Sequence, residues 1–147
     1  MSFSRKQERD ERAGRTERPL AHMARDLGLR LFTPHQYARL LDNGRRSAER
    51  LASGQKKIDY HPVAKLVDPI SNAVWLITEI DPEQRYRAAG LIDLGSGSPD
   101  VGEIDLRSLI PAEKSGDLAV RPDPAFKSAG RLSSYLQTAQ AIGRVIA

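Results

Sequence analysis

Four carboxylate side chains in the second half of the chain are the residues best suited to chemistry. They are Asp93, Asp100, Glu103 and Asp105. The apolar pattern around them predicts two neighbouring strands and their connection, so these side chains are expected to converge. Converging carboxylates bind hard cations such as Mg²⁺ or Ca²⁺ through oxygen. Because a bound Mg²⁺ activates water and stabilises a leaving oxygen, the set predicts a candidate site for a metal-dependent nuclease or phosphodiesterase.

The pattern around these carboxylates leaves two other interpretations open. Asp100 follows a proline, and Glu103-Ile104-Asp105 comes shortly after it. This resembles a nuclease pattern in which Pro-Asp precedes an acid-any-Lys triplet, except that Asp105 stands in the place of the lysine. Acids that alternate with apolar residues are also typical of a half-exposed strand. The same residues therefore fit a binding surface for basic partners, or a solvated strand face.

Cationic side chains gather in the first third of the chain and could contact nucleic-acid phosphates. One group lies near the N-terminus and comprises Arg5, Lys6, Arg9, Arg12, Arg15 and Arg18. A second group, Arg39, Arg46 and Arg50, is spaced to share one face of a predicted helix. Acids interleave with the first group, so a solvated tail of mixed charge is the other interpretation of that group. For the second group, the other interpretation is a solvated helix face.

No catalytic residues and no cofactor are predicted. The chain has no cysteine, which excludes a thiol nucleophile, a zinc ribbon and a disulfide scaffold. His22, His35 and His61 fall in three separate segments without the spacing of metal ligands or a triad. The glycine pair at 95 and 97 leads into a predicted strand rather than a helix. It therefore fits a hairpin turn better than a phosphate loop.

Helix signals define the element that carries the second group of arginines. Thr33, Pro34 and Gln36 form a capping box with proline at the first helical position. Apolar residues then repeat at helical spacing, which predicts an amphipathic helix over residues 34–53. A weaker amphipathic helix is predicted over residues 19–31.

Strand signals follow, and a helix closes the chain. Short apolar runs separated by turn residues predict strands over residues 63–67, 73–80, 89–94, 101–106 and 118–120. The second of these is apolar on both faces, so it is expected to be central. A last helix is predicted to start with Ser133 or Ser134 as its cap. The short connections favour antiparallel pairing.

The predicted fold class is α+β. It comprises an antiparallel sheet of four to five strands with an N-terminal amphipathic helix and a C-terminal helix. Residues 1–31 are expected to form a charged flexible arm with a weak helix, and residues 32–147 a single α+β domain. The mixed-charge start of the arm has too few apolar residues to form a core of its own.

Length and charge restrict the functional classes. A chain of 147 residues fits one domain, and its net charge is +4. The charge is uneven, because residues 1–60 carry 14 Lys and Arg against 8 Asp and Glu, whereas residues 61–110 carry 4 against 8. No run approaches the ~20 apolar residues of a membrane span, and the charged start is unlike a signal peptide. We therefore expect a cytoplasmic protein without a membrane contact.

Several segments resemble one family, the domain-of-unknown-function 2958 family of small bacterial proteins. The resemblance extends from Phe32 to about Val145 and is carried by Leu40–Gly44, His61–Leu66, Val74–Pro82, Gly90–Gly95, Gly97–Gly102 and Leu132–Tyr135. Members of this family are often encoded on plasmids and other mobile elements. The resemblance carries no catalytic residue and no cofactor over to this sequence.

Three functional hypotheses follow. The first is a non-catalytic accessory or interaction protein of a bacterial plasmid or mobile element, which binds a protein partner through its sheet and acidic strand edges. In this hypothesis the basic arm can add a contact to nucleic acid. The second is the metal-dependent nuclease or phosphodiesterase, and the third is a DNA- or RNA-binding protein that uses the arginines of the arm and helix. The oligomeric state stays open.

Overall fold

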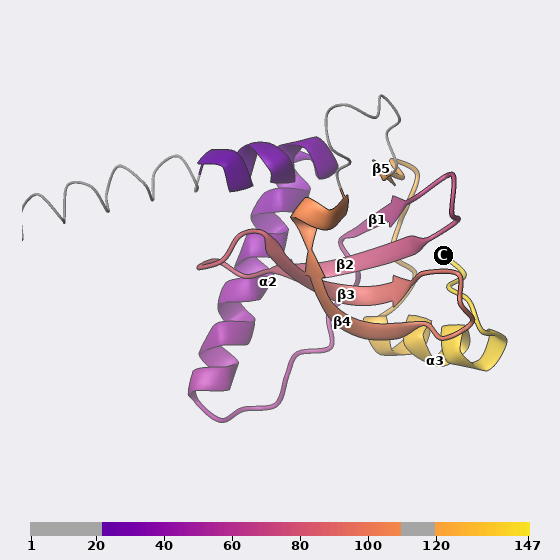
Figure 1. Cartoon of the computed structure of the whole chain (residues 1–147). Helices are drawn as coiled ribbons and strands as arrows, with labels where there is room; N and C mark the ends of the chain where they lie inside the picture. Colours follow the sequence, from indigo (N-terminus) through magenta and orange to yellow (C-terminus); the bar gives the residue numbers. More distant parts are fainter. Residues whose placement is uncertain (1–21, 110–119) are drawn as a thin grey trace, which may run out of the picture.

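The fold was analysed in a computed structural model, which describes residues 22–109 and 120–147 (Figure 1). The part of the expected arm before residue 22 lies outside the described residues, as do residues 118 and 119 of the strand predicted over residues 118–120. Val120 is described and is not in a strand, because the short edge strand there begins at Arg121. No helix in the described part is long and apolar enough to cross a bilayer.

The described elements confirm the predicted α+β class, with five antiparallel strands in one sheet. Residues 22–31 are helical. The later elements are α2 (Pro34–Ala52), β1 (Ala64–Val67), β2 (Val74–Ile80), β3 (Arg87–Asp93), β4 (Asp100–Asp105), the 3-10 turn η1 (Leu106–Leu109), β5 (Arg121–Pro122) and α3 (Leu132–Ile142). The order of strands across the sheet is β4-β3-β2-β1-β5, so β2 is central as predicted.

The predicted capping box starts α2. The Thr33 hydroxyl accepts a hydrogen bond from the Gln36 amide at 3.1 Å, and the Gln36 side chain accepts one from the Thr33 amide at 3.0 Å. Pro34 occupies the first helical position, where no amide donor is needed. These contacts fix the point at which α2 begins, and therefore the residues that it turns toward the sheet.

The helix of residues 22–31 belongs to the folded part of the chain. Its Ala24 and Leu31 are buried, and Leu31 packs in the main core. Gly28 lies so close to the Tyr37 ring of α2 that a Cβ at position 28 would stand 2.3 Å from a ring carbon. The folded part therefore includes residues that precede Phe32.

Helices cover both faces of the sheet. Because side chains alternate along a strand, Trp75 and Ile77 of β2 face α2 in the main core, whereas Leu76 faces the other side. On that side Leu76 and Leu91 pack against Ala139 of α3. This alternation explains why β2 is apolar on both faces, as its sequence predicts.

A bulge in β2 is held by α2. The register of β2 on β3 shifts between Ile77 and Glu79, and the extra residue is Thr78. The Asn43 side chain donates to the Thr78 carbonyl at 2.9 Å. Gly44, the next residue of α2, lies against the Ile80 carbonyl. The bulge lets Ile80 keep facing the main core.

The start of α3 differs from the prediction, because neither Ser133 nor Ser134 is its N-cap. The N-cap is Arg131, which makes no capping hydrogen bond with its side chain. Asp59, in the segment before β1, supplies the acceptor instead, and its carboxylate accepts from the Ser133 amide at 3.1 Å. Asp59, which is distant in the sequence, therefore caps the start of α3 in place of the predicted local serine.

Candidate functional site

The four candidate carboxylates lie on β3 and β4 or at their ends, as expected from the strand pattern, but they do not form one cluster. In the β3–β4 register Asp100 is opposite Ile92, Glu103 opposite Ala89 and Asp105 opposite Arg87. Positions 100 and 103 are an odd number of residues apart, so their side chains leave opposite faces of the sheet. Asp93, Glu103 and Asp105 lie on the face toward α3, and Asp100 lies on the other.

The Asp93 carboxylate holds two backbone segments together. Its side chain is buried, with 4% of its surface exposed. One carboxylate oxygen accepts from the Gly95 amide and the other from the Val145 amide, both at 2.9 Å. Both oxygens are thus used to join the end of β3 to the loop after it and to the segment after α3.

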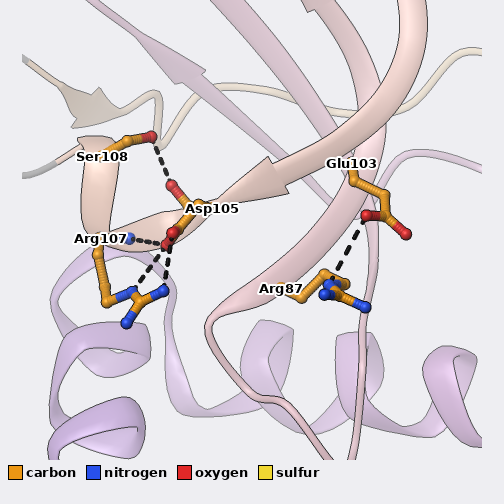
Figure 2. A network of polar contacts seen from close by, with 5 residues as sticks. All are labelled: Arg87, Glu103, Asp105, Arg107 and Ser108. Carbon is orange, nitrogen blue, oxygen red and sulfur yellow. Dashed lines mark hydrogen bonds and ion pairs between the residues drawn. The ribbon is translucent and has the colours of Figure 1, made fainter.

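Asp105 is held by Arg107 in the contact network that Figure 2 shows. The Arg107 Nε and Nη2 atoms donate to the two carboxylate oxygens at 3.0 and 2.9 Å, and the Arg107 amide adds a third hydrogen bond. These contacts from Arg107 lower the pKa of the Asp105 carboxyl below its ordinary value. The Arg107 guanidinium also lies 4.7 Å from the centre of the Tyr86 ring.

Glu103 and Asp100 are more exposed and more weakly engaged. Glu103, with 73% of its side chain exposed, lies 3.7 Å from the Arg87 guanidinium (Figure 2). Asp100 accepts a hydrogen bond from the Val101 amide. Across residues 22–109 and 120–147, no three His, Asp or Glu side chains come close enough to hold a metal ion. The described structure therefore gives the nuclease hypothesis no metal centre.

The comparisons with known proteins decide the family. The family model described as "Protein of unknown function (DUF2958)" matches residues 31–146. The chain belongs to this family. The match confirms the resemblance inferred from the sequence over nearly the same range. No curated protein and no solved structure gives a significant match.

The most exposed strand of this DUF2958 domain is β4, which forms one of the two edges of the sheet. Five of its six residues are exposed, and only Ile104 is buried. Beside it an open depression of about 970 Å³ separates the end of β4 from the β2–β3 turn. Tyr86, Arg87, Glu103 and Arg107 are among the residues that line this depression. Two ion pairs lie in its lining, Arg87 with Glu103 and Arg107 with Asp105.

The candidate nucleic-acid residues of the DUF2958 domain lie on α2, on the side of the sheet opposite Glu103. Arg39 is exposed. Arg46 forms an ion pair with Asp42 at 3.2 Å, and Arg50 donates to the Lys56 carbonyl at 3.4 Å. The six cations from Arg5 to Arg18 lie outside the described residues.

Two features of this surface were missed by the sequence reasoning. The first is the Arg107–Asp105 ion pair, whose guanidinium also lies over the Tyr86 ring. The available signal was an arginine two positions after an aspartate. The second is the length of α3, which has 11 residues and covers only part of its side of the sheet. Gly143, which caps the end of this helix, was the available signal.

Proposed function

We propose that this chain is a non-catalytic accessory protein that binds a protein partner through β4 and the adjoining uncovered part of the sheet. The observation that carries the proposal is the exposure of β4, an unbroken six-residue strand at the edge of the sheet. Its setting, a bacterial plasmid or mobile element and the cytoplasm, is proposed from the family resemblance alone, which is an associational argument.

The uncovered part of the sheet adjoins β4 on the side of α3. Figure 1 shows α3 beside the ends of β3 and β4 that lie nearest the C-terminus. Leu91 of β3 is buried there, whereas Arg87, four residues earlier on the same face, is exposed. A partner that binds to this region would contact the backbone edge of β4 and the charged side chains of Arg87, Glu103 and Arg107.

Site-specific photo-crosslinking tests the proposal. A photoreactive benzoyl-phenylalanine in place of Val101, which is exposed on β4, is expected to form a discrete protein adduct when irradiated in the host cell. The control places the same group at Leu51 of α2, whose surface is 80% exposed. Adducts of equal yield at both positions, or none at position 101, would contradict a partner-binding site on β4.

We propose nucleic acid as a second contact, made by the cations of residues 1–18 together with Arg39 and Arg46. The supporting observation is that α2 and Glu103 lie on opposite sides of the sheet, so the two contacts do not exclude each other. Phosphate contacts of this kind act through release of counterions and depend strongly on salt.

Salt titration tests this second contact. Replacing the six cations between Arg5 and Arg18 by glutamine is expected to weaken binding to a short DNA duplex. It should also reduce the slope of log affinity against log salt by about 0.9 for each lost phosphate contact. The matched control replaces Glu8, Asp10, Glu11 and Glu17 by glutamine, and its affinity should rise. An unchanged slope in the first variant would remove residues 1–18 from the contact.

A further inference from the structure

The two edges of the sheet differ in their ability to accept another strand. One edge is β5, which has two residues and includes Pro122, a residue without an amide donor. The other is β4, whose pairing with β3 runs without interruption from Asp105 to Asp100. β4 contains no proline, lysine or bulge, three of the features that protect an exposed edge, and the charged side chains that it carries are acidic.

The register of β4 on β3 shows which backbone groups of β4 point toward β3 and which point away from it. The Leu106 amide donates to the Tyr86 carbonyl at 2.8 Å, in register with the β3–β4 pairs. Because bonded residues alternate in an antiparallel ladder, Val101, Glu103 and Asp105 direct their backbone groups away from β3. Two side-chain contacts agree with this direction. The Val101 amide donates to Asp100, and the Asp105 carbonyl accepts from Ser108 at 2.6 Å.

These two contacts occupy the ends of the edge and leave its centre open. Within the described part of the chain, the outward groups without a partner are both backbone groups of Glu103, the Val101 carbonyl and the Asp105 amide. An antiparallel strand centred opposite Glu103 would use all four. The open groups therefore match one short added strand.

The side chains on this edge favour a basic residue on an added strand. Glu103 lies at the centre of the open groups, and its ion pair with Arg87 is long and exposed. A Lys or Arg directly opposite Glu103 would be favoured, because opposite charges attract across paired strands. A second copy of β4, paired through the same outward backbone groups, would instead place Glu103 opposite Glu103, which is unfavourable.

We infer that β4 accepts an extended, basic segment of the protein partner as an additional antiparallel strand, with Lys or Arg opposite Glu103. This inference rests on the proposed function, since it names how the same surface holds its partner. Backbone hydrogen bonds supply affinity for any extended segment, and the residue opposite Glu103 makes the binding selective for a basic one, as in other cases of strand addition.

A synthetic peptide tests the inference on the full chain. The probe is Thr-Lys-Thr-Lys-Thr-Val-Thr, whose central lysine is placed opposite Glu103 and whose valine is placed opposite Val101. In the free protein the Glu103 and Asp105 amides should exchange quickly with solvent. At saturating peptide their exchange, followed by NMR, should slow about tenfold or more, because both become hydrogen bonded.

Two control peptides separate strand addition from simple attraction of charges. One carries glutamate in place of both lysines, and the other carries an N-methyl group on the central lysine, which removes the amide that would donate to Glu103. Neither should slow the exchange. Equal binding of the N-methylated peptide, or slow exchange of the Glu103 amide before any peptide is added, would overturn the inference.

A charge reversal in the protein gives an independent measurement. Glu103→Lys should weaken binding of the basic peptide about tenfold, whereas the matched Glu49→Lys on α2 should leave it unchanged. Both glutamates are exposed, so both variants should fold. If Val101 crosslinks a partner in cells but the basic peptide does not bind, strand addition fails while the proposed function stands.

Discussion

Replacing Gly44 by alanine is expected to destabilise the protein by about 3 kcal/mol, although alanine is the better helix former. A Cβ at position 44 would lie 1.8 Å from the Ile80 carbonyl oxygen and 2.8 Å from its carbon. Both are backbone atoms of β2, so no side-chain rotation can relieve the overlap. Either α2 must move away from the sheet or the bulge in β2 must change.

Thermal unfolding measures this loss. For a domain of this size each kcal/mol corresponds to about 4 °C, so the midpoint should fall by roughly 12 °C. The matched control is Gly102→Ala on β4, where a Cβ would meet only the end of the Ile92 side chain at 3.4 Å. Its midpoint should change little. Equal midpoints for Gly44→Ala and the unmodified protein would mean that α2 does not approach Ile80 this closely.

The Gly44 contact shows what the sequence reveals about this fold and what it does not. Local signals were sufficient for α2, because its capping box lies within four residues, and for β2, because its apolar pattern is continuous. The position of the bulge was not predictable. It depends on the hydrogen bond between Asn43 and Thr78, which are 35 residues apart in the chain. Tyr60 extends this network by donating to the Asn43 carbonyl at 2.7 Å.

The candidate site was predictable in part for a related reason. The sequence placed its acids on two adjacent strands, and the structure agrees. Their expected convergence depended on which way each side chain points, and the alternation along β4 separates Asp100 from Glu103. It also depended on what surrounds each acid. The partner of Asp93 is the Val145 amide, 52 residues later, and no local pattern indicates it.

Replacing Asp93 by alanine is the second change with a large expected effect. It removes a buried carboxylate and leaves the amides of Gly95 and Val145, which are exposed and half-buried, without their acceptor. A buried donor that loses its partner costs about 1–3 kcal/mol. Because water can reach the exposed Gly95 amide, most of the loss comes from the Val145 amide, and we expect about 2 kcal/mol in total. Gly143, in the left-handed conformation with φ of 88°, ends α3 and leads the chain toward Val145. The segment after α3 should therefore detach first, which hydrogen exchange at the Val145 amide would detect.

The same variant separates a structural carboxylate from a metal ligand. If Asp93 acts only through these two amides, a chelator should leave the unfolding midpoint of the unmodified protein unchanged, and Mg²⁺ should not raise it. Asp100→Ala is the matched control, because that carboxylate is exposed and accepts a hydrogen bond only from the next amide. The free energy of unfolding of this variant should fall by less than about 0.5 kcal/mol. A midpoint that rises with Mg²⁺ in the unmodified protein, and not in Asp93→Ala, would restore the metal-dependent hypothesis. Without such a rise, two interpretations of the exposed acids on β4 stay open, a binding surface for a basic partner and a solvated strand face.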